Sequence, residues 1–426
     1  PYSATSTFAM NPMLVDLEQL AAQGWLGADE LEEYFANRRP PTESVDYGSV
    51  EPAKSRMLEH AWRRWRDQRQ REREFQAFTE QHAWWLADYA LYSAIKQAHG
   101  HQSWRDWPDP LAARHAEALE EARSSHAEAI EQIEFQQWLV HRQWSSLRDY
   151  AADRGVELVG DIPIFVAMDS AEVWAHREYF QLDEYGRADV VSGVPPDYFS
   201  EEGQKWGNPL YDWDALAEAD YDWWLDRVAK VLEMVDLVRL DHFRGFEAYW
   251  AVPADAENAV DGEWREGPKD ALFEAIRDRF GDVPFIAEDL GMITDEVREL
   301  RDRQRLPGMK IMQFAFDGSD DHPFLPHTYP ERCVTYTGTH DNDTTAGWWE
   351  STDSSTKHQV RTYLSCSDGQ VVWSMIEAIL DSDAMLAIFP VQDIFELGTK
   401  ARMNLPGRPD GNWSWRMTRD MLQPSH

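Results

Sequence analysis

The spacing of apolar residues divides the chain into a helical first part and a second part of short apolar runs. Between residues 15 and 150, apolar residues recur every three or four positions, as at Trp62, Trp65, Phe75 and Phe78. This spacing puts them on one side of a helix. We therefore expect helices whose tryptophan stripes pack into a core.

After residue 155, short apolar runs alternate with helical stretches. The runs are VELVGDIPIFV (156–166), VDLVRLDH (235–242), PFIAEDLG (284–291), KIMQFAFD (310–317), CVTYTGTHD (333–341) and AIFPVQD (387–393). Runs of this length between helices predict parallel strands in βα units. Acidic residues stand at their C-terminal ends: Asp161, Asp241, Glu288, Asp317, Asp341 and Asp393. In a (β/α)8 barrel that rim carries the active site.

These runs predict an α/β fold, a (β/α)8 TIM barrel that forms a single catalytic domain. Residues 1–155 would hold the start of the rim and a mainly helical insertion, and residues 156–426 would hold strands three to eight. Rim insertions are expected at about 165–225 and 246–275. The runs supply six of eight strands, and the chain opens on PYSATSTFAMNP without an initiator methionine. We therefore expect the first two βα units in an N-terminal segment of about 60 residues that this sequence lacks.

Composition narrows the class of partner. Asp and Glu number 77 against 41 Lys and Arg, a formal net charge of −36. Such a surface repels nucleic acid and anionic membranes, so we expect neither as a partner. An acidic chain with few lysines fits a salt-adapted proteome or a GC-rich genome, and the sequence leaves both open. The two cysteines, Cys333 and Cys366, match no disulfide framework or zinc spacing, which favours a cytoplasmic location.

Two carboxylates stand at the ends of consecutive predicted strands. Adjacent strands lie roughly 4.8 Å apart. Asp241 and Glu288 would therefore approach the ~5–5.5 Å separation of the two carboxyl groups in a retaining glycosidase. One carboxylate would attack the anomeric carbon and form a glycosyl-enzyme ester. The other would protonate the leaving oxygen and later deprotonate the acceptor.

The neighbours of the two carboxylates indicate their roles. Arg239, two residues before Asp241, would share its face of the strand and keep it ionised, as a nucleophile requires. An apolar run precedes Glu288 and Asp289 follows it. Both features favour the protonated carboxyl group that a general acid needs.

A third carboxylate comes from YTGTHDNDTT (336–345). Asp341, with His340, would brace the sugar hydroxyls as the ring flattens toward an oxocarbenium ion. Taken singly, an acid at a strand end is more often a helix N-cap or half of an ion pair. Three such acids on one rim, each beside His, Arg or another acid, favour catalysis.

The segment PPDYFSEEGQKWGNPLYDWD (195–214) is interpreted as a loop beside the sugar. Its aromatic rings would stack on pyranose faces, while Gln204, Asn208 and Asp197 would hydrogen-bond hydroxyl groups. The alternative is a surface loop packed by its own aromatic residues. DNDTTAG (341–347) lacks the Gly and Glu of a calcium loop, and no nucleotide fingerprint is present. We expect no metal and no cofactor.

Long motifs in a fixed order resemble glycoside hydrolase family 77, the 4-α-glucanotransferases also called amylomaltases or disproportionating enzymes. The motifs are PYSATSTFAMNP, GVPPDYFSEEGQKWGNPLY, VRLDHFRGF, IAEDLG, PGMKIMQFAFD, YTGTHDNDTTAGW and RMNLPGRPDGNWSWR. The resemblance implies a retaining barrel of the α-amylase clan with helical and mixed insertions at the rim. It implies transfer of an α-1,4-glucan segment to the 4-hydroxyl of an acceptor glucan or glucose. The implied partners are α-1,4-glucans and maltooligosaccharides.

The resemblance also implies roles for single residues. Asp241 resembles the family's nucleophile, Glu288 its acid/base, Asp341 its transition-state stabiliser and Arg239 the residue that positions the nucleophile. The implied or candidate sugar contacts are His340 and Asn404 on the donor side, Tyr2, Gln204, Trp206, Phe314 and Asp317 on the acceptor side, and also Asp197 and His242. The chemistry by itself leaves open an α-1,4-glucan hydrolase of the same clan and a non-catalytic glucan-binding protein.

Overall fold

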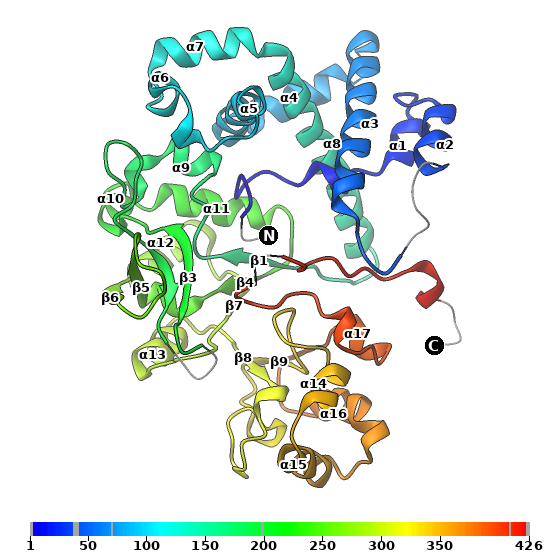
Figure 1. Cartoon of the computed structure of the whole chain (residues 1–426), viewed down its shortest axis with the longest axis vertical. Helices are drawn as coiled ribbons and strands as arrows, with labels where there is room; N and C mark the ends of the chain where they lie inside the picture. Colours follow the sequence, from blue (N-terminus) through cyan, green and yellow to red (C-terminus); the bar gives the residue numbers. More distant parts are fainter. Residues whose placement is uncertain (1–2, 37–41, 70, 197–199, 409, 423–426) are drawn as a thin grey trace. The chain divides into compact units, whose positions relative to one another are not determined.

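The structure is a computed structural model that describes residues 3–36, 42–69, 71–196, 200–408 and 410–422 (Figure 1). The chain divides into two compact units. Unit 1 comprises Pro1–Phe35, Glu51–Phe285 and Gly291–Leu300, and unit 2 comprises Ala36–Val50, Ile286–Leu290 and Arg301–His426. Within the described residues, no helix combines the length and the apolar character needed to cross a membrane.

Helices occupy the first part of the chain, as the apolar spacing predicts, and most of them belong to unit 1. They are α1 (Leu17–Ala22), α2 (Ala28–Ala36), α3 (Tyr47–Gln68), α4 (Glu72–Gln81), α5 (Ala83–Ala98), α6 (Asp109–Ala112), α7 (Ala116–Ser125) and α8 (Ala127–Ala152). The tryptophan stripes pack inward: Trp62 and Trp65 are buried, and the ring centroid of Trp65 lies 4.8 Å from that of Phe135. Trp84 is an exception, with 44% of its surface exposed.

Unit 1 contains the first two predicted strands. β1 (Val159–Pro163) pairs in parallel with β4 (Leu237–Asp241), with Asp161 opposite Arg239. The segment between them includes the helices α9 (Ala171–Ala175), α10 (Trp213–Glu218) and α11 (Asp222–Leu232). The backbone N–H of Val238 in β4 donates to the carbonyl of Pro284 at 3.0 Å, directly before β7 (Phe285–Ala287). The helix α12 (Asp270–Phe280) precedes that strand.

The predicted rim insertions form a second, antiparallel sheet in unit 1. Its order is β3-β2-β5-β6, with β2 (Val190–Val194), β3 (Gln204–Pro209), β5 (Ala248–Pro253) and β6 (Glu263–Glu266). The interpretation of residues 195–214 as a loop is therefore wrong for β3. Gly203 has φ +66°, and a Cβ there would lie 2.4 Å from the carbonyl oxygen of Val194. Only glycine allows the chain to enter β3 so close to β2.

Unit 2 contains the remaining predicted strands. β7 crosses from unit 1 into unit 2, and β8 (Gly308–Ile311), β9 (Cys333–Tyr336) and β10 (Leu386–Ile388) follow it as parallel neighbours in that order. The helices of this part are α13 (Asp295–Arg303), which begins in unit 1, α14 (Thr345–Ser351), α15 (Ser354–Leu364), α16 (Val371–Leu380) and α17 (Val391–Ile394). Met312, Val360 and Met375 are fully buried at the centre of its core. The strand order β1-β4-β7-β8-β9-β10, with helices between strands, confirms an α/β fold.

Of the six predicted strand-end acids, only Asp241 and Glu288 stand at the end of a strand. Asp161 is the middle residue of β1, and Asp341 lies beyond Tyr336, the last residue of β9. Asp317 and Asp393 do not lie at strand ends either. β8 ends at Ile311, and a 3-10 turn (Met312–Phe314) separates it from Asp317. Asp393 lies on α17, where it is 1% exposed. Its oxygens accept hydrogen bonds from the hydroxyl of Thr337 at 2.7 Å and the backbone N–H of Thr345 at 2.8 Å. Asp393 therefore holds segments of unit 2 together.

Candidate active site

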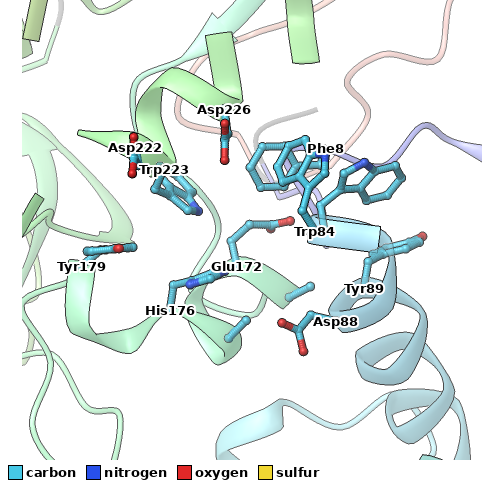
Figure 2. A pocket seen from close by; sticks show the side chains of 13 residues that line it. Phe8, Trp84, Asp88, Tyr89, Glu172, His176, Tyr179, Asp222, Trp223 and Asp226 are labelled. Carbon is cyan, nitrogen blue, oxygen red and sulfur yellow. The ribbon is translucent and has the colours of Figure 1, made fainter. Parts of the chain in front are cut away.

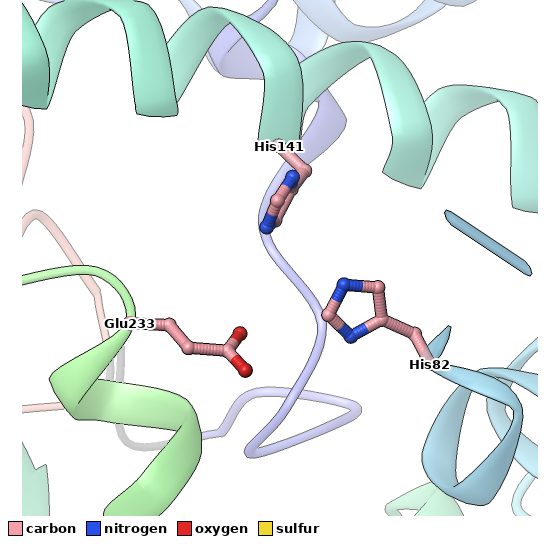
Figure 3. A group of neighbouring side chains, drawn as sticks. All are labelled: His82, His141 and Glu233. Atoms are coloured by element: carbon pink, nitrogen blue, oxygen red, sulfur yellow. The ribbon is translucent and has the colours of Figure 1, made fainter. Parts of the chain in front are cut away.

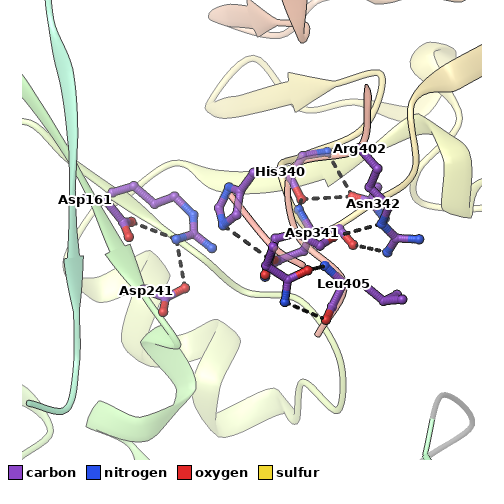
Figure 4. Close-up of polar contacts among 11 residues, drawn as sticks. Asp161, Asp241, His340, Asp341, Asn342, Arg402 and Leu405 are labelled. Carbon is purple, nitrogen blue, oxygen red and sulfur yellow. Dashed lines mark hydrogen bonds and ion pairs between the residues drawn. The ribbon is translucent and has the colours of Figure 1, made fainter. Parts of the chain in front are cut away.

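The candidate nucleophile at the end of β4 belongs to a cluster of three charged residues in unit 1. Arg239 Nη1 lies 2.8 Å from Asp241 Oδ1 and 2.7 Å from Asp161 Oδ1 (Figure 4). Strand alternation puts Arg239 and Asp241 on one face, and the parallel register sets Asp161 beside Arg239. The Arg239 side chain is 11% exposed, so little water competes for its charge. The geometry matches the expected position of Arg239 and gives Asp161 a contact that the sequence did not predict.

Three candidate sugar contacts come together in unit 1. The indole N–H of Trp206 donates to Gln204 Oε1 at 3.2 Å, and the ring meets that of His242 in a T-shaped contact with centroids 4.9 Å apart. Trp206 is 40% exposed and offers aromatic surface to a ligand. Burial lowers the pKa of His242 to about 4, so the imidazole is neutral at pH 7. A neutral imidazole has one donor and one acceptor, which suits a sugar hydroxyl.

In unit 2, the segment after β9 holds Asp341 firmly. Asn404 Nδ2 donates to Asp341 Oδ1 at 2.6 Å, and His340 Nε2 lies 3.5 Å from the same oxygen (Figure 4). Arg402 Nη2 donates to the backbone carbonyl of Asp341 at 2.6 Å. The backbone N–H of Asn404 donates to the carbonyl of His340 at 3.0 Å. Two motifs far apart in the sequence thus form one cluster, and Arg402 is a member that the sequence did not predict.

Glu288 follows β7 directly, in unit 2. Its Oε1 accepts the backbone N–H of Leu290 at 3.0 Å. The next residue, Asp289, is buried: its Oδ2 lies 2.5 Å from Arg301 Nη1, and its Oδ1 accepts the backbone N–H of Met309 at 2.7 Å. Arg301 offsets the charge of Asp289. The negative charge of Asp289 is therefore directed at Arg301 and not at Glu288 alone.

The other candidate contacts are more isolated or lie outside the described residues. Asp317 is 56% exposed, and its Oδ1 accepts the backbone N–H of Ser319 at 2.9 Å in a local turn. Phe314 is half-buried, with its ring centroid 6.3 Å from that of Phe324. Tyr2 and Asp197 are not among the described residues.

One group of side chains among the described residues has the chemistry of metal ligands. His82, His141 and Glu233 in unit 1 bring ligand atoms within 4.8 Å of one another (Figure 3). Lys230 Nζ lies 2.9 Å from Glu233 Oε2, and the indole N–H of Trp85 donates to His82 Nδ1 at 3.4 Å. A fixed ammonium beside Glu233 opposes a metal cation there. We interpret the group as a polar contact between helices.

Carboxylates at or beyond strand ends, with aromatic and amide side chains near them, are typical of enzymes that act on glycosides. The family model described as 4-alpha-glucanotransferase, of glycoside hydrolase family 77, matches residues 1–422. The chain belongs to this family.

Individual relatives agree with this assignment. A 4-alpha-glucanotransferase of Thermus thermophilus is 50% identical, over 100% of this chain and 86% of its own length. One from Synechocystis sp. is 44% identical, over 99% of this chain and 84% of its own length. The structure of amylomaltase from Streptococcus agalactiae in complex with acarbose matches with a TM-score of 0.96 at 34% identity, over 100% of this chain and 86% of that one.

Proposed function

We propose that this 4-α-glucanotransferase moves an α-1,4-glucan segment from a donor maltooligosaccharide or glucan to the 4-hydroxyl of an acceptor glucan or glucose. The reaction retains the configuration of the anomeric carbon, through a covalent bond to Asp241. Membership in the family supports the transfer activity. The observation that carries the mechanism is the contact of Asp241 with Arg239 at the end of β4.

In the first step, Asp241 attacks the anomeric carbon while Glu288 donates a proton to the leaving glycosidic oxygen. Arg239 Nη1 holds Asp241 Oδ1, so we assign the attack to Oδ2. In the second step, Glu288 removes the proton from the acceptor 4-hydroxyl, whose oxygen attacks the anomeric carbon and releases Asp241. Asp341, held by Asn404, is proposed to bind the ring hydroxyls while positive charge develops on the sugar.

Sugar contacts outside the reacting centre are proposed from the clusters within each unit. His340 and Asn404 would bind the donor sugar, and Gln204, Trp206 and His242 the acceptor. Tyr2, Asp197, Phe314 and Asp317 remain proposed contacts. We further propose that the six strands of the α/β sheet belong to a (β/α)8 barrel, which the strand order and the likeness to amylomaltase support. The free cysteines Cys333 and Cys366 favour the cytoplasm as its compartment.

Incubation with maltotriose tests the activity. A ladder of longer oligomers with released glucose indicates a transferase, whereas glucose and maltose alone would indicate a hydrolase. Unchanged maltotriose, with binding retained, would indicate a glucan-binding protein.

Asp241→Ala tests the covalent step. We expect it to lower turnover by several orders of magnitude and to leave maltotriose binding largely intact, because it removes the nucleophile and little else. Asp295→Ala is the control, since that aspartate forms an exposed pair with Arg298 at 2.7 Å. Nearly full activity of Asp241→Ala would end the assignment.

A further inference from the structure

Unit 1 contains a cavity of about 160 Å³ that shares no residue with the candidate active site (Figure 2). It lies where the N-terminal segment, α5, α9 and α11 meet. Its aromatic lining consists of Phe8, Trp84, Trp85, Tyr89, Tyr179 and Trp223. A cavity of about 150 Å³ holds a benzene molecule. The space therefore suits a single six-membered ring.

The aromatic lining is partly open to solvent. Trp84 is 44% exposed, although the Phe8 ring supports it in a T-shaped contact with centroids 4.9 Å apart. Tyr179 is half-buried and stacks on His176 with centroids 5.9 Å apart. Exposed aromatic faces are costly to leave in water, and they can stack on the apolar C–H face of a pyranose ring.

The charged groups around the cavity exclude an anionic ligand. Its acidic side chains are Asp88, Glu172, Asp222 and Asp226, and no lysine or arginine is part of the lining. Asp88 lies 2.7 Å from Arg114, and Asp226 lies 2.7 Å from Arg279. These two carboxylates are already neutralised by partners outside the cavity. They can accept hydrogen bonds without attracting a cation.

Glu172 is a buried carboxyl group in the wall of the cavity. The side chain is 4% exposed, and its Oε1 accepts the hydroxyl of Ser6 at 2.5 Å. Its Oε2 has no hydrogen-bond partner among the described residues. Burial raises the pKa of this carboxyl group.

We propose that this cavity is a second, non-catalytic sugar site that holds one glucosyl unit of an α-glucan. The aromatic faces, and two carboxylates that already have cationic partners, fit a neutral ring with many hydroxyl groups. The identity of the sugar as glucose rests on the proposed function. Such a site tethers a long glucan to the enzyme and makes no difference to a substrate too short to reach both sites.

Trp84→Ala tests the site, with Trp373→Ala as a matched control. Trp373 is also 44% exposed, but it lies on α16 in unit 2. Native electrophoresis in gels with and without amylopectin measures affinity for the polymer. We expect Trp84→Ala to weaken that affinity about tenfold, as removal of an aromatic anchor does. Its kcat and KM with maltotriose should equal those of the wild type, and Trp373→Ala should match the wild type in both assays.

A second variant separates loss of the site from loss of folding. Asp222→Asn keeps the size of an exposed side chain at the start of α11, and it should weaken polymer binding in the same direction with an unchanged unfolding midpoint. Wild-type polymer affinity in both variants would overturn the sugar site. A second result would also overturn it: the wild type binds tetramethylammonium, and Trp84→Ala loses that binding but keeps its affinity for the polymer. The cavity would then be a site for a cation. Failure of the proposed function is seen separately, as a lack of maltotriose transfer by the wild type.

Discussion

Replacing Arg301 by methionine should destabilise unit 2, because it leaves the carboxylate of Asp289 buried without its partner. The Asp289 side chain is 6% exposed and lies 2.5 Å from Arg301 Nη1. Opposite charges about 4 Å apart attract by ~4 kcal/mol at an effective dielectric constant of ~20. Breaking a buried pair costs about 3–5 kcal/mol. Arg301 is 20% exposed and the N–H of Met309 stays bonded to Asp289, so we expect a loss of ~3 kcal/mol.

Urea unfolding followed by tryptophan fluorescence measures this loss. Arg298→Met is the control on the same helix, since Arg298 pairs with Asp295 at 2.7 Å where the two side chains are 52% and 87% exposed. An exposed pair contributes only ~0–1 kcal/mol. The double variant Arg301→Met/Asp289→Asn should recover much of the stability, because no charge is left buried. A loss in Arg301→Met no larger than in Arg298→Met would refute the reasoning.

Two further predictions concern single side chains. Asn404→Ala removes the hydrogen-bond donor that lies 2.6 Å from Asp341 Oδ1. We expect turnover of maltotriose to fall by about 100-fold, because Asp341 is then no longer held in place, and the unfolding midpoint to stay unchanged. An unaltered kcat would contradict this. His82, which faces His141, Lys230 and Glu233, has a pKa lowered by burial to about 4. The unfolded chain, with a histidine pKa of about 6.5, takes up the proton first on acidification. The free energy of unfolding should therefore fall between pH ~6.5 and ~4, by up to ~3 kcal/mol. Urea titrations across this range measure the free energy of unfolding, which should change less steeply with pH in His82→Asn than in the wild type. An equal slope in the two proteins would exclude His82 as the cause.

Strands buried on both faces were predictable, because they need continuous apolar residues. The runs around β7 and β9 were located for this reason, because every residue of these two strands is buried. The runs around β1 and β4 also contain strands, although β1 is partly exposed and the burial of β4 alternates. The run at 310–317 was extended too far, since apolar residues of a 3-10 turn look like those of a strand. β3 was missed because its sequence, QKWGNP, is polar and contains Gly and Pro, which an edge strand tolerates.

Contacts within one strand were also predictable, whereas contacts between distant segments were not. Arg239 and Asp241 lie two residues apart, so alternation placed them together. The contact of Arg239 with Asp161 depends on the register of β1 against β4, which the sequence does not reveal. The family resemblance named Asn404 as a sugar contact, but its bond to Asp341 was not predicted. The rule that strand-end acids are functional failed for Asp393, because the chain had already turned into α17.

The cluster of Asp161, Arg239 and Asp241 also restricts how the sequence can change. A slip of β4 by one residue would turn Arg239 and Asp241 to the opposite face of the sheet and away from Asp161. The pairing of β1 with β4 in the correct register therefore also places Asp241, the proposed nucleophile, beside Arg239 and Asp161. Leu237, Val238 and Leu240 of β4 can accept apolar substitutions, but an insertion or deletion within the strand would separate the proposed nucleophile, Asp241, and Arg239 from Asp161.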